Sequence, residues 1–183
     1  MSGSKIEFST ITTDEYKKLT EFEIIYGVVE SQFGHCLIAL NNESICYMSL
    51  FDEGKENSAI DHLTKDWPNA TLREDNKKIE EVSKGIFESN SARLNVLLRG
   101  TELQCNVWKE LTNLKEGMTA SYEQIAKAVG NPKAIRAVAS AIAKNKIAYL
   151  IPCHRVIRKT GAPNKYRWGP ERKIQILKLE SKK

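Results

Sequence analysis

The apolar and polar positions along the chain predict strands in the first half and mainly helices in the second. Three short runs rich in β-branched and aromatic residues span residues 24–30, 35–40 and 44–50, and turns containing Gly34 or Asn42 separate them. Such runs, joined by Gly and Asn turns, predict an antiparallel meander of three strands. The residues before the first run alternate only weakly, so we assign no element there.

Two helices are expected after the meander, at residues 57–66 and 76–88. The second has apolar residues at core-facing spacing, and a proline closes the first. The polar segment 89–92 then interrupts the pattern. We therefore place a domain boundary there, with an N-terminal α/β domain at residues 1–92 and a C-terminal domain at residues 93–183.

The second half opens with a predicted helix at residues 103–114. Ser121 and Gln124 then have the spacing of a capping box, which opens a further helix that Gly130 ends. Asn131, as the N-cap, starts the next helix almost at once. Two helices separated by three residues are typical of a helix-turn-helix.

The second of these helices, residues 132–144, has a proline at its first position and two distinct faces. The face expected to point inward holds Ile135, Val138, Ala139 and Ile142. The opposite face combines small residues with cations: Lys133, Arg136, Ala137, Ser140, Ala141 and Lys144. Small side chains let a helix approach a nucleic-acid groove, while cations contact phosphates. An ordinary amphipathic helix would show the same pattern.

Composition is that of an ordinary globular protein, with 41% hydrophobic and 28% charged residues. No apolar run reaches membrane-spanning length, and residues 1–4 lead into no signal peptide, so we expect a cytoplasmic protein. Four cysteines in a chain of 183 residues without a secretory signal favour reduced thiols over a disulfide scaffold.

Charge is divided unevenly between the two halves of the chain. Residues 1–99 hold 11 Lys/Arg and 17 Asp/Glu, a net charge of −6, whereas residues 100–183 hold 17 and 6, a net charge of +11. This division predicts that the C-terminal part binds a polyanion. A lysine-rich solvated surface with a disordered tail at residues 181–183 would also account for it.

The candidate chemistry lies in the apolar segment 150–156, where Cys153 stands between Pro152 and His154. A thiol becomes a nucleophile only as the thiolate, and His154 or Arg155 could favour that form. A small core cysteine at a strand end is the alternative. Neighbours on a regular strand point to opposite faces, so direct chemistry between Cys153 and His154 requires the chain to bend.

The other cysteines are expected to pack rather than react. His35, Cys36 and Cys46 lack the spacing of a zinc site, and both cysteines fall within predicted strands, so we expect no metal there. Cys105 stands near a helix start, where a thiol pKa can fall, but packing explains it equally well.

The C-terminal half resembles the O6-alkylguanine-DNA alkyltransferases, also called methylated-DNA–protein-cysteine methyltransferases, and most closely the bacterial type. The motifs that carry this resemblance extend over about 80 residues: Gly100-Thr101, Val107-Trp108, Ser121-Tyr122, Asn131 to Ala134, Arg136 to Val138, Asn145, Ile151 to Val156, Tyr166 to Gly169, and Glu180. The N-terminal half resembles the family only through its meander and the Phe33-Gly34 turn. Leu103 departs from the pattern, because an aromatic residue is frequent there.

The resemblance implies an α+β protein with a three-stranded antiparallel, RNase H-like N-terminal domain and a winged helix-turn-helix C-terminal domain. It implies repair of double-stranded DNA without a cofactor or metal, by a monomer that is used once. The alkyl group on guanine O6, or less well on thymine O4, would pass to Cys153 by SN2 attack after the base has been flipped out of the duplex.

It also implies roles for the residues around Cys153. His154 would act as the base through a bound water, and Glu180 would orient the histidine. Tyr122 would assist departure of the guanine, and Asn145 would tie the recognition helix to the active-site segment. Without the resemblance, these would be a solvated Glu, an ordinary first-turn Tyr and a plain C-cap.

The remaining family positions concern DNA and the base. Arg136 matches the intercalating arginine, Ala137 and Ser140 match the close-approach surface in the minor groove, and Lys133 and Lys144 would contact phosphates. Tyr166, Arg167 and Trp168 fall where a loop closes the base pocket, although Trp168 also suits a core position.

Two other classes of protein share parts of this pattern. Alkyltransferase-like proteins recognise lesions without catalysis because they lack the acceptor cysteine, and the presence of Cys153 argues against that class. A helix-turn-helix transcription regulator would bind undamaged, sequence-specific DNA, and the chain is too short for the extra regulatory domain of the bifunctional family members.

Overall fold

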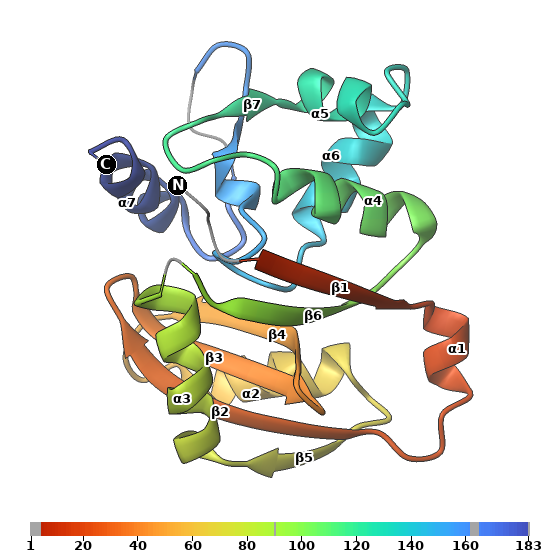
Figure 1. Ribbon diagram of the computed structural model, residues 1–183, viewed down its shortest axis with the longest axis vertical. Helices are drawn as coiled ribbons and strands as arrows, with labels where there is room; N and C mark the ends of the chain where they lie inside the picture. Colours follow the sequence, from red (N-terminus) through yellow and green to blue (C-terminus); the bar gives the residue numbers. More distant parts are fainter. Residues whose placement is uncertain (1–4, 90, 162–164, 183) are drawn as a thin grey trace. The chain divides into compact units, whose positions relative to one another are not determined.

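The computed structural model describes residues 5–89, 91–161 and 165–182 (Figure 1). The N-terminal residues 1–4, Asn90 of the expected domain boundary and Lys183 of the expected tail lie outside the described residues. The chain forms two compact units, residues 1–100 and residues 101–183. Within the described residues, no helix is both long and apolar enough to cross a membrane.

A six-stranded mixed sheet forms the centre of the first unit. The expected meander is confirmed: β2 (Glu23–Ser31), β3 (Gly34–Asn41) and β4 (Ser44–Phe51) pair antiparallel. The expectation of a purely antiparallel, three-stranded sheet is wrong, because three further strands join it in parallel pairs. These are β1 (Lys5–Ile11), β5 (Thr71–Glu74) and β6 (Arg93–Arg99), and the strand order is β1-β6-β4-β3-β2-β5.

The position of β6 explains why the first unit extends beyond the boundary expected at residue 92. This strand pairs with β1 along its whole length and with the start of β4. Its backbone hydrogen bonds therefore belong to the sheet, and the division between the units falls after Gly100.

Helices cover both faces of the sheet, with α3 (Asn76–Phe87) in front and α2 (Glu56–Asp66) behind it in Figure 1. A short helix α1 (Thr13–Lys17) follows β1. Because both faces are covered, β3 and β4 are buried almost throughout. Cys36 and Cys46 lie buried in these strands, where their thiols donate to backbone carbonyls.

The second unit contains four α-helices among its described residues and a pair of short parallel strands, β7 (Ala120–Ser121) and β8 (Val156–Ile157). The helices are α4 (Glu102–Leu111), α5 (Tyr122–Ala128), α6 (Ile135–Ala143) and α7 (Pro170–Glu180). The expected capping box at the start of α5 is present: the Ser121 hydroxyl accepts from the Gln124 N–H, and the Gln124 side chain accepts from the Ser121 N–H.

The start of α6 differs from the expectation. The helix begins at Ile135 with Ala134 as its N-cap, so Asn131 is not the cap and residues 131–134 form a turn. The reason is that α5 ends in a Schellman motif: the Asn131 N–H donates to the Ala126 carbonyl and Gly130 has a φ of 75°. Asn131 therefore closes the first helix instead of opening the second.

The faces of α6 are correspondingly rotated from the expected ones. Ala141 is buried, and its carbonyl accepts a hydrogen bond of 2.8 Å from the Trp108 indole. Ile135, which was expected to point inward, is 39% exposed. The inner face of α6 is therefore formed by Val138, Ala141 and Ile142.

Candidate active site

Cys153 and His154 lie in a single turn of 3-10 helix, η1 (Cys153–Arg155), which leads directly into β8. The chain therefore bends at the point where a regular strand would have sent the two side chains to opposite faces. Cys153 is 8% exposed and His154 is fully buried. The turn brings a thiol and an imidazole into the same buried region.

Asn145 connects the end of α6 to this turn. Its side-chain amide donates to the carbonyls of Ile147 and Ile151, at 3.2 and 3.0 Å, and its oxygen accepts from the Ile147 N–H. The same amide nitrogen lies 3.3 Å from the Cys153 sulfur. Asn145 is buried, so these bonds are shielded from competing water and fix the segment that carries the thiol.

The resting form of Cys153 is the protonated thiol. Burial raises its pKa, and the hydrogen bond from Asn145 and the positive charges of Lys173 and Arg167 only partly oppose this effect. A thiol in this state needs a base before it can act as a nucleophile.

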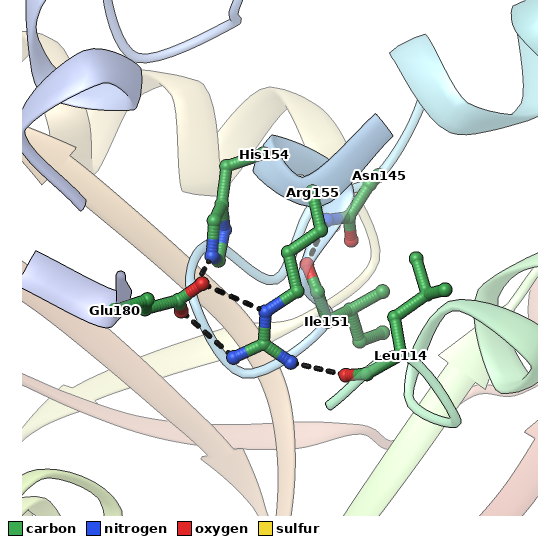
Figure 2. Close-up of polar contacts among 6 residues, drawn as sticks. All are labelled: Leu114, Asn145, Ile151, His154, Arg155 and Glu180. Atoms are coloured by element: carbon green, nitrogen blue, oxygen red, sulfur yellow. Dashed lines mark hydrogen bonds and ion pairs between the residues drawn. The ribbon is translucent and has the colours of Figure 1, made fainter. Parts of the chain in front are cut away.

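His154, Glu180 and Arg155 form a buried ion-pair network (Figure 2). The Glu180 carboxylate lies 2.9 Å from His154 Nε2 and accepts two hydrogen bonds from the Arg155 guanidinium, at 3.0 and 2.7 Å. The guanidinium also donates to the Leu114 carbonyl. Arg155 thus joins α7 and the segment after α4 to the turn that bears Cys153.

This network fixes the protonation states of the pair. Burial opposes ionisation of Glu180, but hydrogen bonds from His154 and Arg155 outweigh it and lower the Glu180 pKa to about 2. Burial likewise lowers the pKa of His154, although the bond to Glu180 acts in the opposite direction. The ring is therefore neutral at pH 7. Since a carboxylate only accepts, Nε2 carries the proton and Nδ1 holds a free lone pair.

Within the described residues, His154 Nδ1 is buried and has no hydrogen-bond partner. An unsatisfied buried nitrogen of this kind is costly and is characteristic of a group that takes part in chemistry or binds a water. The arrangement can therefore accept a proton at Nδ1 while Glu180 stabilises the resulting imidazolium.

Aromatic rings surround the imidazole. The Tyr149 ring is nearly parallel to it, with centroids 6.2 Å apart, and the Tyr166 ring meets it edge-on at 6.4 Å. Tyr166 packs in turn against Trp168, and both are buried, whereas Arg167 between them is exposed. Of the three expected pocket residues, Tyr166 thus lies beside the histidine, Trp168 packs behind Tyr166, and the charge of Arg167 acts on the pKa of Cys153.

Tyr122, the first residue of α5, lies within electrostatic range of the thiol. Burial raises the pKa of its phenol, the charge of Arg158 lowers it, and Cys153 raises it further. The hydroxyl is therefore protonated at pH 7.

The expected DNA-binding residues share the exposed surface of α6 and the turn before it. Lys133, Arg136, Ala137, Ser140 and Lys144 are all exposed, and Ile135 joins them. Because Asn145 directly follows the last of these, the surface and the Cys153 segment are connected by a single buried side chain.

Lys173 is a site residue that the sequence analysis missed. It is only 2% exposed, and its ammonium group donates a hydrogen bond of 2.7 Å to the Val156 carbonyl. It is also close enough to Cys153 for their charges to interact. Burial lowers its pKa to about 8. The available signal was its spacing: Lys173, Ile176 and Glu180 occupy one buried stripe of α7.

Comparison with known proteins gives one consistent result for the second unit. A family model described as the DNA-binding domain of 6-O-methylguanine DNA methyltransferase matches residues 102–182. This range includes the turn with Cys153, helix α6 and the whole network around Glu180.

Relatives extend the similarity to most of the chain. A methylated-DNA–protein-cysteine methyltransferase of Methanosarcina acetivorans is 36% identical over 85% of this chain and 97% of its own length. The bifunctional transcriptional activator and DNA repair enzyme Ada of Escherichia coli is 38% identical over 85% of this chain, which spans only 45% of that longer protein. The crystal structure of Mycobacterium tuberculosis OGT in complex with DNA has a TM-score of 0.67, with 26% identity, and covers 87% of this chain and 93% of its own.

Proposed function

The chain belongs to the O6-alkylguanine-DNA alkyltransferase family, and we propose that it repairs duplex DNA by moving alkyl groups irreversibly from guanine O6 to Cys153. The observation that carries this proposal is the buried pair of Cys153 and His154, in which a neutral imidazole has one nitrogen held by Glu180 and the other without a partner among the described residues. The proposal extends to thymine O4 as a poorer substrate.

The reaction consists of one proton transfer and one displacement. The Cys153 thiol proton passes through a water to His154 Nδ1, and the thiolate attacks the alkyl carbon. The new S–C bond forms as the C–O6 bond breaks, and the electron pair of that bond leaves with guanine. Tyr122 donates a proton to the leaving guanine, and the proton held by His154 then returns through solvent to the Tyr122 phenolate, so that the thiol proton ends on guanine. The alkylated cysteine is not regenerated.

The charged groups around the thiol support these steps. Glu180 stabilises the imidazolium that forms on His154, and Arg155 keeps that carboxylate ionised. Lys173, whose charge lowers the Cys153 pKa, favours the thiolate once the base has removed the proton. Asn145 holds the sulfur through its amide.

Helix α6 delivers the alkylated base to this site. The O6 carbon is hidden within the stack of a duplex, so the nucleotide must rotate out before Cys153 can reach it. In the proposal Arg136 fills the gap that is left, Ala137 and Ser140 permit close approach to the minor groove, and Lys133 and Lys144 bind phosphates. Tyr166, Arg167 and Trp168 enclose the flipped base.

The architecture that we propose follows the same family. The mixed sheet with its antiparallel meander supports an RNase H-like N-terminal domain, and α5, α6 and the β7–β8 pair support a winged helix-turn-helix C-terminal domain. Four reduced, buried cysteines support a cytoplasmic location. The match over residues 102–182 supports residues 101–183 as the DNA-binding and transferase unit, whereas β6 belongs to the sheet of the first unit.

The test is the stoichiometry and site of transfer. After incubation with a duplex that contains O6-methylguanine, mass spectrometry should find one added methyl group, located on Cys153, and product should never exceed one per protein molecule. Cys153→Ser should abolish transfer while lesion binding remains. Cys105→Ser, which removes another buried thiol of the same unit, is the matched control and should retain transfer. Methylation that persists in Cys153→Ser would refute the mechanism, and binding without transfer by the unmodified protein would favour a non-catalytic lesion-recognition protein.

A further inference from the structure

Tyr149 has a backbone conformation that a tyrosine rarely adopts. Its φ is 64°, in the left-handed region, and Asn42 is the one other non-glycine residue with a positive φ among the described residues. Asparagine tolerates this region, whereas a bulky side chain there is strained. Such strain persists where the surrounding structure requires the side chain, and it is concentrated at functional sites.

The side chain of Tyr149 lies over the imidazole of His154. The two ring planes are 9° apart, and the 6.2 Å between their centroids is within the range of offset aromatic pairs. Tyr149 is itself half-buried, while His154 beneath it is fully buried. The strained backbone therefore presents an aromatic cover to the ring that accepts the proton in the proposed function.

Other groups act on the same imidazole and do not duplicate this cover. Glu180 and Lys173 of α7 and Arg155 of η1 act through charge, and Glu180 bonds only to Nε2. Tyr166 meets the ring edge-on. Burial raises the pKa of the Tyr149 phenol, and the charges of Glu116, in the segment after α4, and of Glu180 raise it further. The charge of Arg155 lowers it. Tyr149 alone among these lies parallel to the imidazole plane.

We propose that Tyr149 is a positioning residue for His154: its ring fixes the plane of the imidazole and covers one face of it, so that Nδ1 stays in place for the water that relays the proton of Cys153. This inference rests on the proposed function, since it concerns the same base. It predicts that the strain at residue 149 is maintained for activity and opposes stability.

Three variants of Tyr149 distinguish the effect of its aromatic ring from the effect of its strained backbone. Tyr149→Gly and Tyr149→Asn tolerate the left-handed conformation and remove the phenol, so relief of backbone strain offsets part of the packing lost with the ring and the melting temperature should change little. Their transfer rate to Cys153 from free O6-benzylguanine, used as a probe that needs no DNA, should fall on the order of tenfold, because the general base is less well oriented. Tyr149→Phe keeps the ring and should retain the rate. Asn42→Gly, a left-handed position in the other unit, should also retain it.

The pH profile gives a readout that a purely structural role would leave unchanged. Burial lowers the pKa of His154, so opening the site to water should raise that pKa and move the acidic limb of the rate profile to higher pH. The same shift should appear in alkylation of Cys153 by iodoacetamide, which tests the base without the transfer reaction.

These measurements distinguish the two ideas. Absence of transfer by the unmodified protein would remove the proposed function, whereas the iodoacetamide profile would still report on Tyr149. Normal transfer and an unchanged profile in Tyr149→Gly would overturn the positioning role. A large fall in the melting temperature of Tyr149→Gly would also overturn it, because the loss of rate would then follow from the loss of stability.

Discussion

Individual side chains around Cys153 act mainly by setting which groups are charged. Burial alone would keep Cys153, His154 and Glu180 all neutral. Hydrogen bonds from His154 and from the Arg155 guanidinium outweigh this effect at Glu180 and lower the pKa of its carboxyl. The result is an ionised orienting residue, a neutral base and a protonated nucleophile, which is the set of starting states that a base-assisted thiol requires.

Glu180 should make the second unit sensitive to acid. Its pKa is 4.5 when unperturbed and about 2 in the folded protein, so it contributes stability above pH 4.5 that is lost as the pH falls towards 2. This difference corresponds to about 3 kcal/mol of unfolding free energy. Burial also lowers the His154 pKa, and its protonation in the unfolded chain adds to the loss.

Urea unfolding at a series of pH values, followed by circular dichroism, measures this effect. Glu180→Gln should be less stable than the parent at pH 7 and should lose little further stability between pH 4.5 and 2. Glu123→Gln removes a carboxylate that pairs with Lys127 and Lys159 at the surface, where pairs contribute little, and should behave like the parent. A parent protein whose stability is constant over this range would contradict the assignment.

The sequence identified most of the site because its residues fall within recognisable motifs, and Cys153, His154, Asn145 and Glu180 do meet in the structure. The sequence did not predict Lys173 as a site residue because a lysine on a helix is ordinarily solvated, and only tertiary packing buries this one. The left-handed backbone of Tyr149 leaves no trace in composition or periodicity. The burial of Lys173 depends on a hydrogen bond to Val156, in a different element of the second unit.

At the level of elements, α6 connects the exposed surface that we propose binds DNA to the segment that carries Cys153. Its exposed surface carries Arg136, its inner face packs on Trp108, and the residue that follows its C-cap is Asn145. A change in the position of this helix is therefore transmitted to the Cys153 segment through buried hydrogen bonds. Substitutions on the exposed surface should leave those bonds intact.

Arg136→Ala should consequently separate DNA repair from intrinsic reactivity. We expect its rate with an O6-methylguanine duplex to fall by at least about tenfold, because the cost of unstacking, a few kcal/mol, is no longer offset. Its rate with free O6-benzylguanine should remain near that of the parent. Lys84→Ala removes an exposed cation of α3 and serves as the control. Equal losses on both substrates would exclude a role in base extrusion.

The sequence predicted some helices and strands correctly and missed others. The meander, α2 and α3 were predictable because their periodic patterns are long and their turns are marked by Gly, Asn or Pro. Strands β1 and β5 are edge strands with exposed residues, so they lack a buried pattern. The start of α6 was misjudged because Asn131 and Pro132 suit a helix start, yet the Asn131 N–H already closes α5.

For the whole molecule, the uneven charge is the dominant electrostatic feature. Counted by unit, residues 1–100 carry a net charge of −6 and residues 101–183 a net charge of +11. A polyanion is attracted to one unit and repelled by the other. Binding of DNA should therefore involve the second unit and be governed by displaced counterions.

Affinity of the full chain for duplex DNA should fall linearly on a plot of log K against log salt concentration. Replacement of Lys133, Arg136 and Lys144 by Ala should reduce the slope by roughly 0.9 for each phosphate contact removed. Fluorescence anisotropy with a labelled duplex measures both slopes, and Lys84→Ala should match the parent. The full chain is required, since a fragment that begins at residue 93 would remove β6 from its sheet. An affinity independent of salt would disprove the electrostatic account.

The burial of Cys153 also bears on how long a molecule remains usable. Peroxides and other oxidants react with exposed thiolates, and the first product, a sulfenic acid, leads on to forms that are not restored. Cys153 is 8% exposed and protonated at rest, so it presents neither property. Under the proposed function each molecule is consumed by one alkyl transfer, so this inertness preserves the thiol until a base that fits the site reaches it.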